Sequence, residues 1–142
     1  MMSRDAARRR VLVAWLPVVL YTLLIWWLSS QRIDFALLDR VPLKDKGVHF
    51  LEYGALSFFS MHAIAITWSA GAIPTVAAAT VITTGLGVLD ELHQSFVPGR
   101  SSDVLDLVAD VIGALTWALI YAGISAAFRY FKRTRAPNTL TQ

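Results

Sequence analysis

Four long apolar stretches determine what this chain can fold into. They cover Val11–Leu28, Gly47–Ser69, Ala72 to about Leu89, and Val104–Phe128. About 20 apolar residues in a helix cross the ~30 Å hydrocarbon core of a bilayer, and each stretch is close to that length or exceeds it. Because the bilayer core offers no water to the backbone, such segments cross it as helices. The sequence therefore predicts an all-α, polytopic membrane protein with a four-transmembrane-helix bundle.

The first stretch is expected to stay in the protein as a helix and not to be cleaved as a signal peptide. Arginines at 8–10 precede it, as in a signal peptide. However, the run is long and holds three tryptophans, and it is followed by Ser29-Ser30-Gln31 and not by an A-x-A-like cleavage site. We therefore divide the chain into a basic N-tail (1–10), a membrane domain (11–128) and a basic, partly disordered C-tail (129–142).

The distribution of lysine and arginine predicts the orientation of the bundle. The N-tail and the C-tail carry four basic residues each, the loop after the first span carries four, and the loop after the third span carries one. Cytoplasmic termini place eight of these residues inside and five outside. Because basic residues are retained on the cytoplasmic side, both termini are predicted to be cytoplasmic. The two long loops then face the extracytoplasmic side.

The composition excludes several classes of function. With 56% hydrophobic and 16% charged residues, the chain is more apolar than a soluble domain. It has no cysteine, which excludes disulfides, thiolate metal ligands and a cysteine nucleophile. The net charge is +3, but the basic residues do not line one face, so no nucleic-acid partner is expected.

Ionisable side chains recur at one end of the expected bundle. Charges inside membrane spans are costly, and they usually mark a functional site or a paired structural network. In the second span, Asp45, His49 and Glu52 share a face at spacings of 4 and 3. Tyr53 lies at the edge of that face. In the third span, the shared face comprises Thr83, Gly87, Asp90 and Gln94, with Glu91 and His93 on either side.

The fourth span repeats this pattern with three aspartates. Asp103, Asp106 and Asp110 recur at spacings of 3 and 4, and Gly113 continues the stripe. Asp103 is expected to act at the helix N-terminus, where an acid suits the helix dipole. At a rise of 1.5 Å per residue, Asp110 lies about 10 Å deeper. A carboxylate at that depth needs a partner, a water-filled cavity or a proton.

Other polar and small residues have structural interpretations. Pro98-Gly99 predicts a tight turn that presents Arg100 to the acids, either as a structural clasp or as a ligand-binding group. His62 lies on a different face from His49 and is expected to hydrogen-bond to another helix. Small residues, among them Ala109, Gly113, Gly85 and Gly87, are expected to allow close helix packing.

Three ordered motifs in these segments resemble the VanZ-like family of integral membrane proteins. They are LSSQ at 28–31, DKGVHFLEYG at 45–54 and DELHQSFVPGR at 90–100, followed by Asp106, Asp110 and Gly113. The resemblance runs from about Val11 to Tyr121 in the order and spacing of the family. At Asp110 many members carry Asn, so this chain has one more potential charge. The resemblance implies a multi-pass protein of the bacterial cell membrane, in a family associated with resistance to the glycopeptide teicoplanin.

The first hypothesis is that the extracytoplasmic polar residues bind an anionic lipid or glycolipid headgroup. The partners would be membrane lipids or a lipid-linked envelope precursor. Basic groups would hold phosphate, while acids would position them and accept sugar hydroxyls. The expected ligand-binding residues are Lys46, Glu52, Tyr53, Gln94, Arg100, Asp106 and Asp110.

The alternative is a membrane-embedded hydrolase or transferase that acts on a lipid-linked envelope substrate. Its catalytic residues would be Glu91, His49 and Asp90, with Glu91 as acid or base and a histidine as base. No cofactor is expected, apart from a divalent metal held through oxygens of Asp90, Asp106 and Asp110. No known catalytic motif is present. Two further alternatives are an oligomeric transporter and a purely structural hydrogen-bond network.

Overall fold

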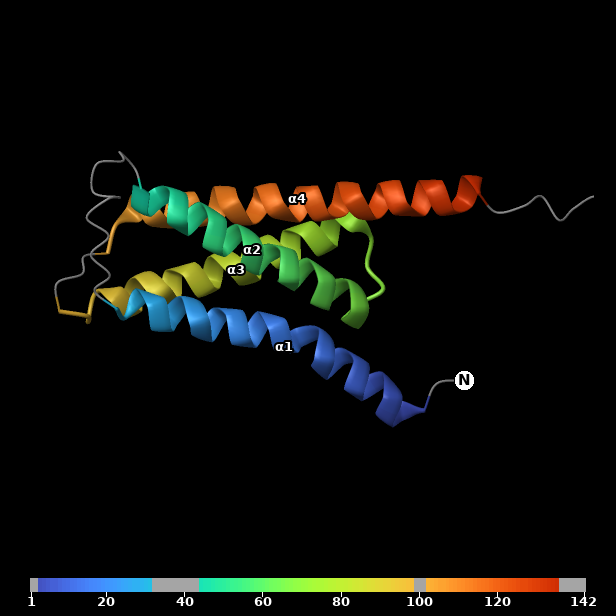
Figure 1. The fold of residues 1–142 in the computed structure, drawn as a ribbon, viewed down its shortest axis with the longest axis horizontal. Helices are drawn as coiled ribbons and strands as arrows, with labels where there is room; N and C mark the ends of the chain where they lie inside the picture. The colour runs from blue at the N-terminus through green and yellow to red at the C-terminus, as the bar shows by residue number, and fades with distance from the viewer. Residues whose placement is uncertain (1–2, 32–43, 99–101, 136–142) are drawn as a thin grey trace, which may run out of the picture.

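The computed structural model describes residues 3–31, 44–98 and 102–135, which form four helices (Figure 1). They are α1 (Arg4–Ser29), α2 (Lys44–Thr67), α3 (Ala72–Gln94) and α4 (Val104–Thr134). Each is long and apolar enough to cross a membrane. The predicted all-α bundle of four candidate membrane spans is therefore confirmed.

Two helices extend beyond the apolar stretches into basic sequence. α1 begins at Arg4 because Ser3 caps it, its side chain accepting a hydrogen bond from the Ala6 amide. α4 continues to Thr134, and Lys132 and Arg133 in its last turn complement the helix dipole. The arginines at 8–10 are thus helical, although the sequence placed them in a tail.

Helix α2 lies at the centre of the packing. It contacts α4 most extensively and also packs against α1 and α3, whereas α1 and α3 touch little. One apolar core joins α1 to α2 through Val18, Ile25 and Leu56, and a second joins α2, α3 and α4. Towards its N-terminus, beyond Pro17, α1 diverges from the other helices (Figure 1). Proline removes one helical hydrogen bond and commonly bends a helix in this way.

The outer surface of the bundle is apolar. Large side chains such as Leu12, Ile73 and Val81 are 71%, 85% and 71% exposed. Polar residues instead occupy the interior, where Asp90 and Asp110 are almost fully buried. This inverted distribution suits a lipid environment, because acyl chains solvate the apolar face.

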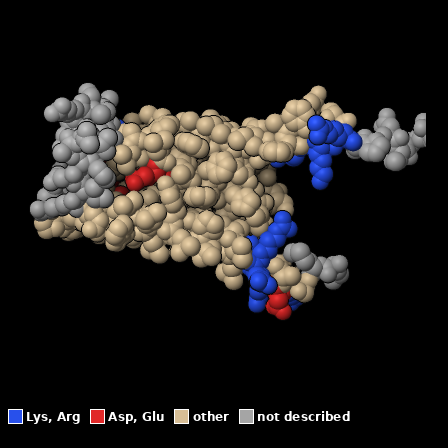
Figure 2. Space-filling model, in the orientation of Figure 1, with Lys and Arg blue, Asp and Glu red and all other residues tan. Residues whose placement is uncertain are grey.

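The chain ends and the polar interior lie at opposite ends of the bundle. Figure 1 shows the start of α1, the turn between α2 and α3, and the end of α4 at one end. In Figure 2 lysine and arginine side chains gather at that end together with one acidic side chain, while a further patch of acidic side chains is visible near the other end. The two described termini therefore lie on the same side of the bundle.

Candidate functional site

Polar side chains from all four helices converge at the end of the bundle opposite the termini. We call this group the polar cluster; it comprises Ser29, Lys46, His49, Tyr53, Asp90, Glu91, Gln94, Asp106 and Asp110. All are buried except Lys46, which is 23% exposed in its side chain. The cluster therefore reaches the surface at Lys46 and its partner Asp103.

The aspartates of α4 divide into a cap and an inward stripe. Asp103 is the N-cap residue, and its side chain accepts a hydrogen bond from the Leu105 amide at 2.9 Å. A hydrogen bond from Lys46, together with this amide, holds the pKa of the Asp103 carboxyl below its usual value. Asp106 and Asp110 point into the bundle, with exposed fractions of 7% and 0%. The predicted capping role of Asp103 and the predicted stripe are both confirmed.

Lys46 joins α2 to the start of α4. Its Nζ lies 2.6 Å from Asp103 Oδ2 and 2.9 Å from Asp106 Oδ1. The sequence placed Asp45 on the polar face of α2, but Asp45 is exposed, and Lys46 lies at the inner face with His49 and Tyr53. Helical spacings of 3 and 4 residues fit both the predicted face, which contains Asp45, and the observed face, which contains Lys46. The packing of α2 against α4 selects the observed face.

His49 and Asp110 form a buried pair across α2 and α4. The His49 Nδ1 atom lies 3.0 Å from Asp110 Oδ1, and the Tyr53 ring stacks on His49 at a centroid distance of 6.1 Å. Gly87 on α3 makes room for this pair, because a Cβ there would lie 2.6 Å from Asp110 Oδ2. The pair therefore depends on close packing of three helices.

Asp90 links α3 to α1. Its Oδ2 accepts hydrogen bonds from Ser29 Oγ at 2.8 Å and from Gln94 Nε2 at 2.9 Å. Nearby, Ser30 Oγ lies 2.8 Å from His93 Nε2. Sequence reasoning missed both serines as site residues. The available signal was their place in the LSSQ motif, where polar side chains end an apolar helix.

Negative charge exceeds positive charge in the cluster. Asp90, Glu91, Asp106 and Asp110 are each 9% exposed or less, whereas the described positive or protonatable groups among them are Lys46 and His49. Glu91 Oε2 accepts a hydrogen bond from the Asp103 amide at 2.9 Å. Within the described residues, Glu91 Oε1 and Asp110 Oδ2 have no hydrogen-bond partner. Such a cluster favours a cation, a proton or hydroxyl donors.

A metal-ligand arrangement exists, but its members differ from those the sequence predicted. His49, Glu91 and Asp106 each offer one ligand atom, and these atoms lie within 4.8 Å of one another. Among the described residues, the expected trio of Asp90, Asp106 and Asp110 does not form such a group. Asp90 Oδ2 instead accepts a hydrogen bond from Ser29 on α1, and Asp110 Oδ1 lies against His49.

The other predicted site residues lie outside the cluster. Glu52 is half-buried on α2. Arg100 and its predicted turn lie outside the described residues. His62 Nδ1 lies 3.2 Å from the Tyr121 hydroxyl of α4, which confirms its predicted helix-to-helix hydrogen bond.

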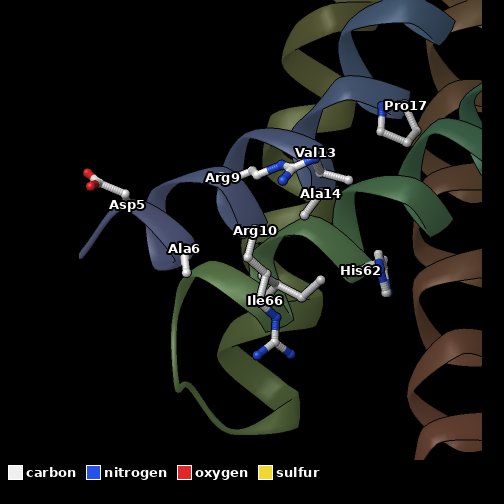
Figure 3. A pocket seen from close by; sticks show the side chains of 9 residues that line it. All are labelled: Asp5, Ala6, Arg9, Arg10, Val13, Ala14, Pro17, His62 and Ile66. Atoms are coloured by element: carbon white, nitrogen blue, oxygen red, sulfur yellow. The ribbon is translucent and has the colours of Figure 1, made fainter. Parts of the chain in front are cut away.

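A groove at the opposite end of the bundle is separate from this chemistry. It has a volume of about 810 Å³ and lies between the diverging part of α1 and the second half of α2 (Figure 3). Its walls are mainly apolar, with arginines at one side. Its lining residues are Asp5, Ala6, Arg9, Arg10, Val13, Ala14, Pro17, His62 and Ile66. No residue of the polar cluster lines it.

Comparison with known proteins identifies the family. No curated protein and no solved structure matches the chain significantly. The VanZ/LLP1 family model matches residues 7–128, which include all four apolar stretches and every residue of the polar cluster. This chain, a multi-pass membrane protein by its four candidate spans, belongs to the VanZ/LLP1 family.

Proposed function

We propose that the protein acts in the bacterial cell envelope, where its polar cluster binds the headgroup of a lipid, glycolipid or lipid-linked envelope precursor. The observation that carries this proposal is the convergence of buried carboxylates from α3 and α4 at one end of the bundle, open to the surface at Lys46 and Asp103. Buried charges in membrane helices are rare unless they serve binding, transport or catalysis.

The expected orientation supports a ligand on the outer membrane surface. Both described termini lie at the end where lysine and arginine side chains gather (Figure 2). By the positive-inside rule we expect that end to lie in the cytoplasm. The polar cluster then opens toward the extracytoplasmic side, where lipid-linked wall precursors are exposed.

The charges of the cluster favour a sugar-bearing headgroup over a simple phosphate. Carboxylate oxygens accept hydrogen bonds from hydroxyls, and Glu91 Oε1 and Asp110 Oδ2 have no such donor among the described residues. Lys46 is already paired with two aspartates, so it is poorly placed to hold an anion by itself. Phosphate recognition would rest on Arg100, and the Arg100→Lys substitution, which removes the guanidinium fork, tests that part separately.

A binding experiment tests the headgroup proposal. Wild-type protein in lipid nanodiscs is titrated with a polyprenyl pyrophosphate that carries a disaccharide, and with the same polyprenyl pyrophosphate without sugar. We expect tighter binding of the sugar-bearing probe and a loss of that preference in Glu91→Gln. Asp5→Asn, at an exposed position on α1, is the matched control. Equal binding of both probes by wild type would overturn the proposal.

Membership of the family further supports a contribution to teicoplanin resistance. Wild type and Glu91→Gln are expressed at matched membrane levels in a Gram-positive host that lacks relatives of this protein. We expect protection against teicoplanin, which carries an acyl anchor, but not against vancomycin, and we expect Glu91→Gln to abolish it. Absence of protection by well-inserted wild type would remove the resistance role.

One observation favours catalysis as a second candidate function. Asp110 holds the His49 ring at 3.0 Å, which is how a general base is commonly oriented, and Glu91 lies close to the same ring. The pair would serve a hydrolase or transferase acting on a lipid-linked substrate. Conversion of the disaccharide probe by wild type but not by His49→Gln is expected under this reading, and no conversion by wild type excludes it.

A further inference from the structure

We propose that His49, Glu91 and Asp106 together bind one Zn²⁺-type divalent ion between α2, α3 and α4. Each residue comes from a different helix, each is buried, and one ligand atom of each lies within 4.8 Å of the other two. Zn²⁺ is bound by histidine and carboxylate ligands at about 2.0–2.2 Å, so tetrahedral ligands lie roughly 3–4 Å apart. Small side-chain adjustments would close the three atoms around an ion.

Each of the three ligands is already oriented by one contact and retains another atom for the ion. His49 uses Nδ1 for Asp110, which leaves Nε2. Glu91 uses Oε2 to accept from the Asp103 amide, and its Oε1 has no hydrogen-bond partner within the described residues. Asp106 contacts Lys46 through Oδ1 at 2.9 Å, which leaves Oδ2. The carboxylate–histidine–metal arrangement is the usual way in which proteins orient a ligating imidazole.

The charge around these residues independently favours a cation. Lys46 neutralises part of the charge on Asp103 and Asp106, but Glu91 and Asp110 have only His49 beside them among the described charged groups. An uncompensated charge in a buried, low-dielectric position is costly. Glu91 is 9% exposed, so solvent offers little compensation for its unpartnered oxygen. A divalent ion would supply the missing positive charge.

The donor set favours Zn²⁺ over Mg²⁺ or Ca²⁺. One imidazole with two carboxylates is a mixed nitrogen and oxygen set, and imidazole is a good ligand for zinc and neighbouring transition metals. Mg²⁺ and Ca²⁺ prefer oxygen ligands throughout. Three protein ligands also leave a coordination position for water or substrate. The site shares residues with the proposed headgroup site, but ion binding does not require that a headgroup binds.

The test measures metal binding by the full-length protein in detergent without added glycolipid. Metal-free protein is titrated with Zn²⁺ against a chromophoric chelator, and Co²⁺ serves as a spectroscopic probe of the coordination. We expect one equivalent of Zn²⁺ per chain, competition by Mg²⁺ at far higher concentrations only, and visible Co²⁺ bands. His49→Gln and Asp106→Asn should lose this binding. Asp110→Asn, which alters the orienting residue, should weaken it by about 10–100-fold.

The control is His62→Gln, the same substitution in the same helix but outside the cluster, and it should leave the affinity unchanged. Zinc bound equally well by wild type and His49→Gln, or lost in His62→Gln, would show adventitious binding and overturn the proposal. Absence of binding by wild type would also overturn it. If His49→Gln fails to insert, Asp106→Asn and Asp110→Asn decide the question, and unchanged affinity in both refutes the site. Zinc binding without headgroup binding would refute the proposed function alone.

Discussion

Replacing Gly113 by alanine probes a close approach of the α2 and α4 backbones next to the polar cluster. A Cβ at this position would lie 3.0 Å from Phe50 Cα and nearer still to the Phe50 carbonyl oxygen. These are backbone atoms of α2, so no side-chain rotation can relieve the clash, and α4 must move away. Overpacking typically costs about 1–3 kcal/mol, and we expect the upper part of that range because the obstacle is backbone. The helix-propensity gain of up to about 1 kcal/mol over glycine offsets only part of it.

The control for this substitution is Gly123→Ala on the same helix. A Cβ at Gly123 would meet nothing within 4 Å, so this variant should be neutral or slightly more stable. Unfolding of both variants in detergent can be followed through the fluorescence of the five tryptophans. Because His49 directly precedes Phe50 and Asp110 lies about one turn before Gly113, Gly113→Ala should also weaken zinc binding. Equal stability of the two variants would refute the close approach of α2 and α4 on which the site depends.

Three further predictions concern contacts within and around the cluster. Ser29→Ala should destabilise the protein by about 1–3 kcal/mol, because it removes a hydrogen-bond donor from the buried Asp90 carboxylate and loosens the packing of α1. In the same unfolding assay, a change below about 0.5 kcal/mol, the size of an ordinary surface substitution, would contradict this link. Ser57→Ala should cost less, roughly 0.6 kcal/mol, because its hydroxyl donates to the Ala114 carbonyl within the apolar part of the bundle. Asp103→Asn keeps the helix cap but removes the charge that Lys46 stabilises. Because the folded-state pKa of Asp103 is lowered, its contribution is fully present above the ordinary pKa of 3.8 and is lost as the pH falls from there through the lower folded-state pKa. The difference in melting temperature between wild type and Asp103→Asn should therefore be visible at pH 7 and vanish in acid; a difference that is the same at both pH values would contradict the charge interaction.

Helical periodicity predicted the inner faces of α3 and α4 correctly. Thr83, Gly87 and Asp90 are all buried, as their spacing indicated, and so are Asp106 and Asp110. In these helices the polar residues form a single stripe, so the pattern has one interpretation. Long uncharged runs were similarly unambiguous, and all four candidate spans are present.

On α2 the same reasoning failed because polar residues surround its N-terminal turns. The set Asp45, His49 and Glu52 and the set Lys46, His49 and Tyr53 both satisfy helical spacing. The structure turns the second set toward α4 and buries His49 and Tyr53, because the Phe50 backbone lies against Gly113 where α2 and α4 approach. The prediction that small residues allow close helix packing holds for only one of the two glycines of α3. Gly87 packs against Asp110, whereas a side chain at Gly85 would meet no neighbour within 4 Å.

By itself the sequence determined that the chain crosses the membrane as helices, because hydrocarbon leaves a long apolar segment no other way to satisfy its backbone. It also determined which residues of each helix can share a face, because the 3.6-residue repeat is a local property. Only the tertiary structure decided that His49, Glu91 and Asp106 meet while Asp90 turns to Ser29. Those distances depend on how each helix is rotated and how closely its backbone approaches its neighbours, and these quantities are set by packing between segments far apart in the chain.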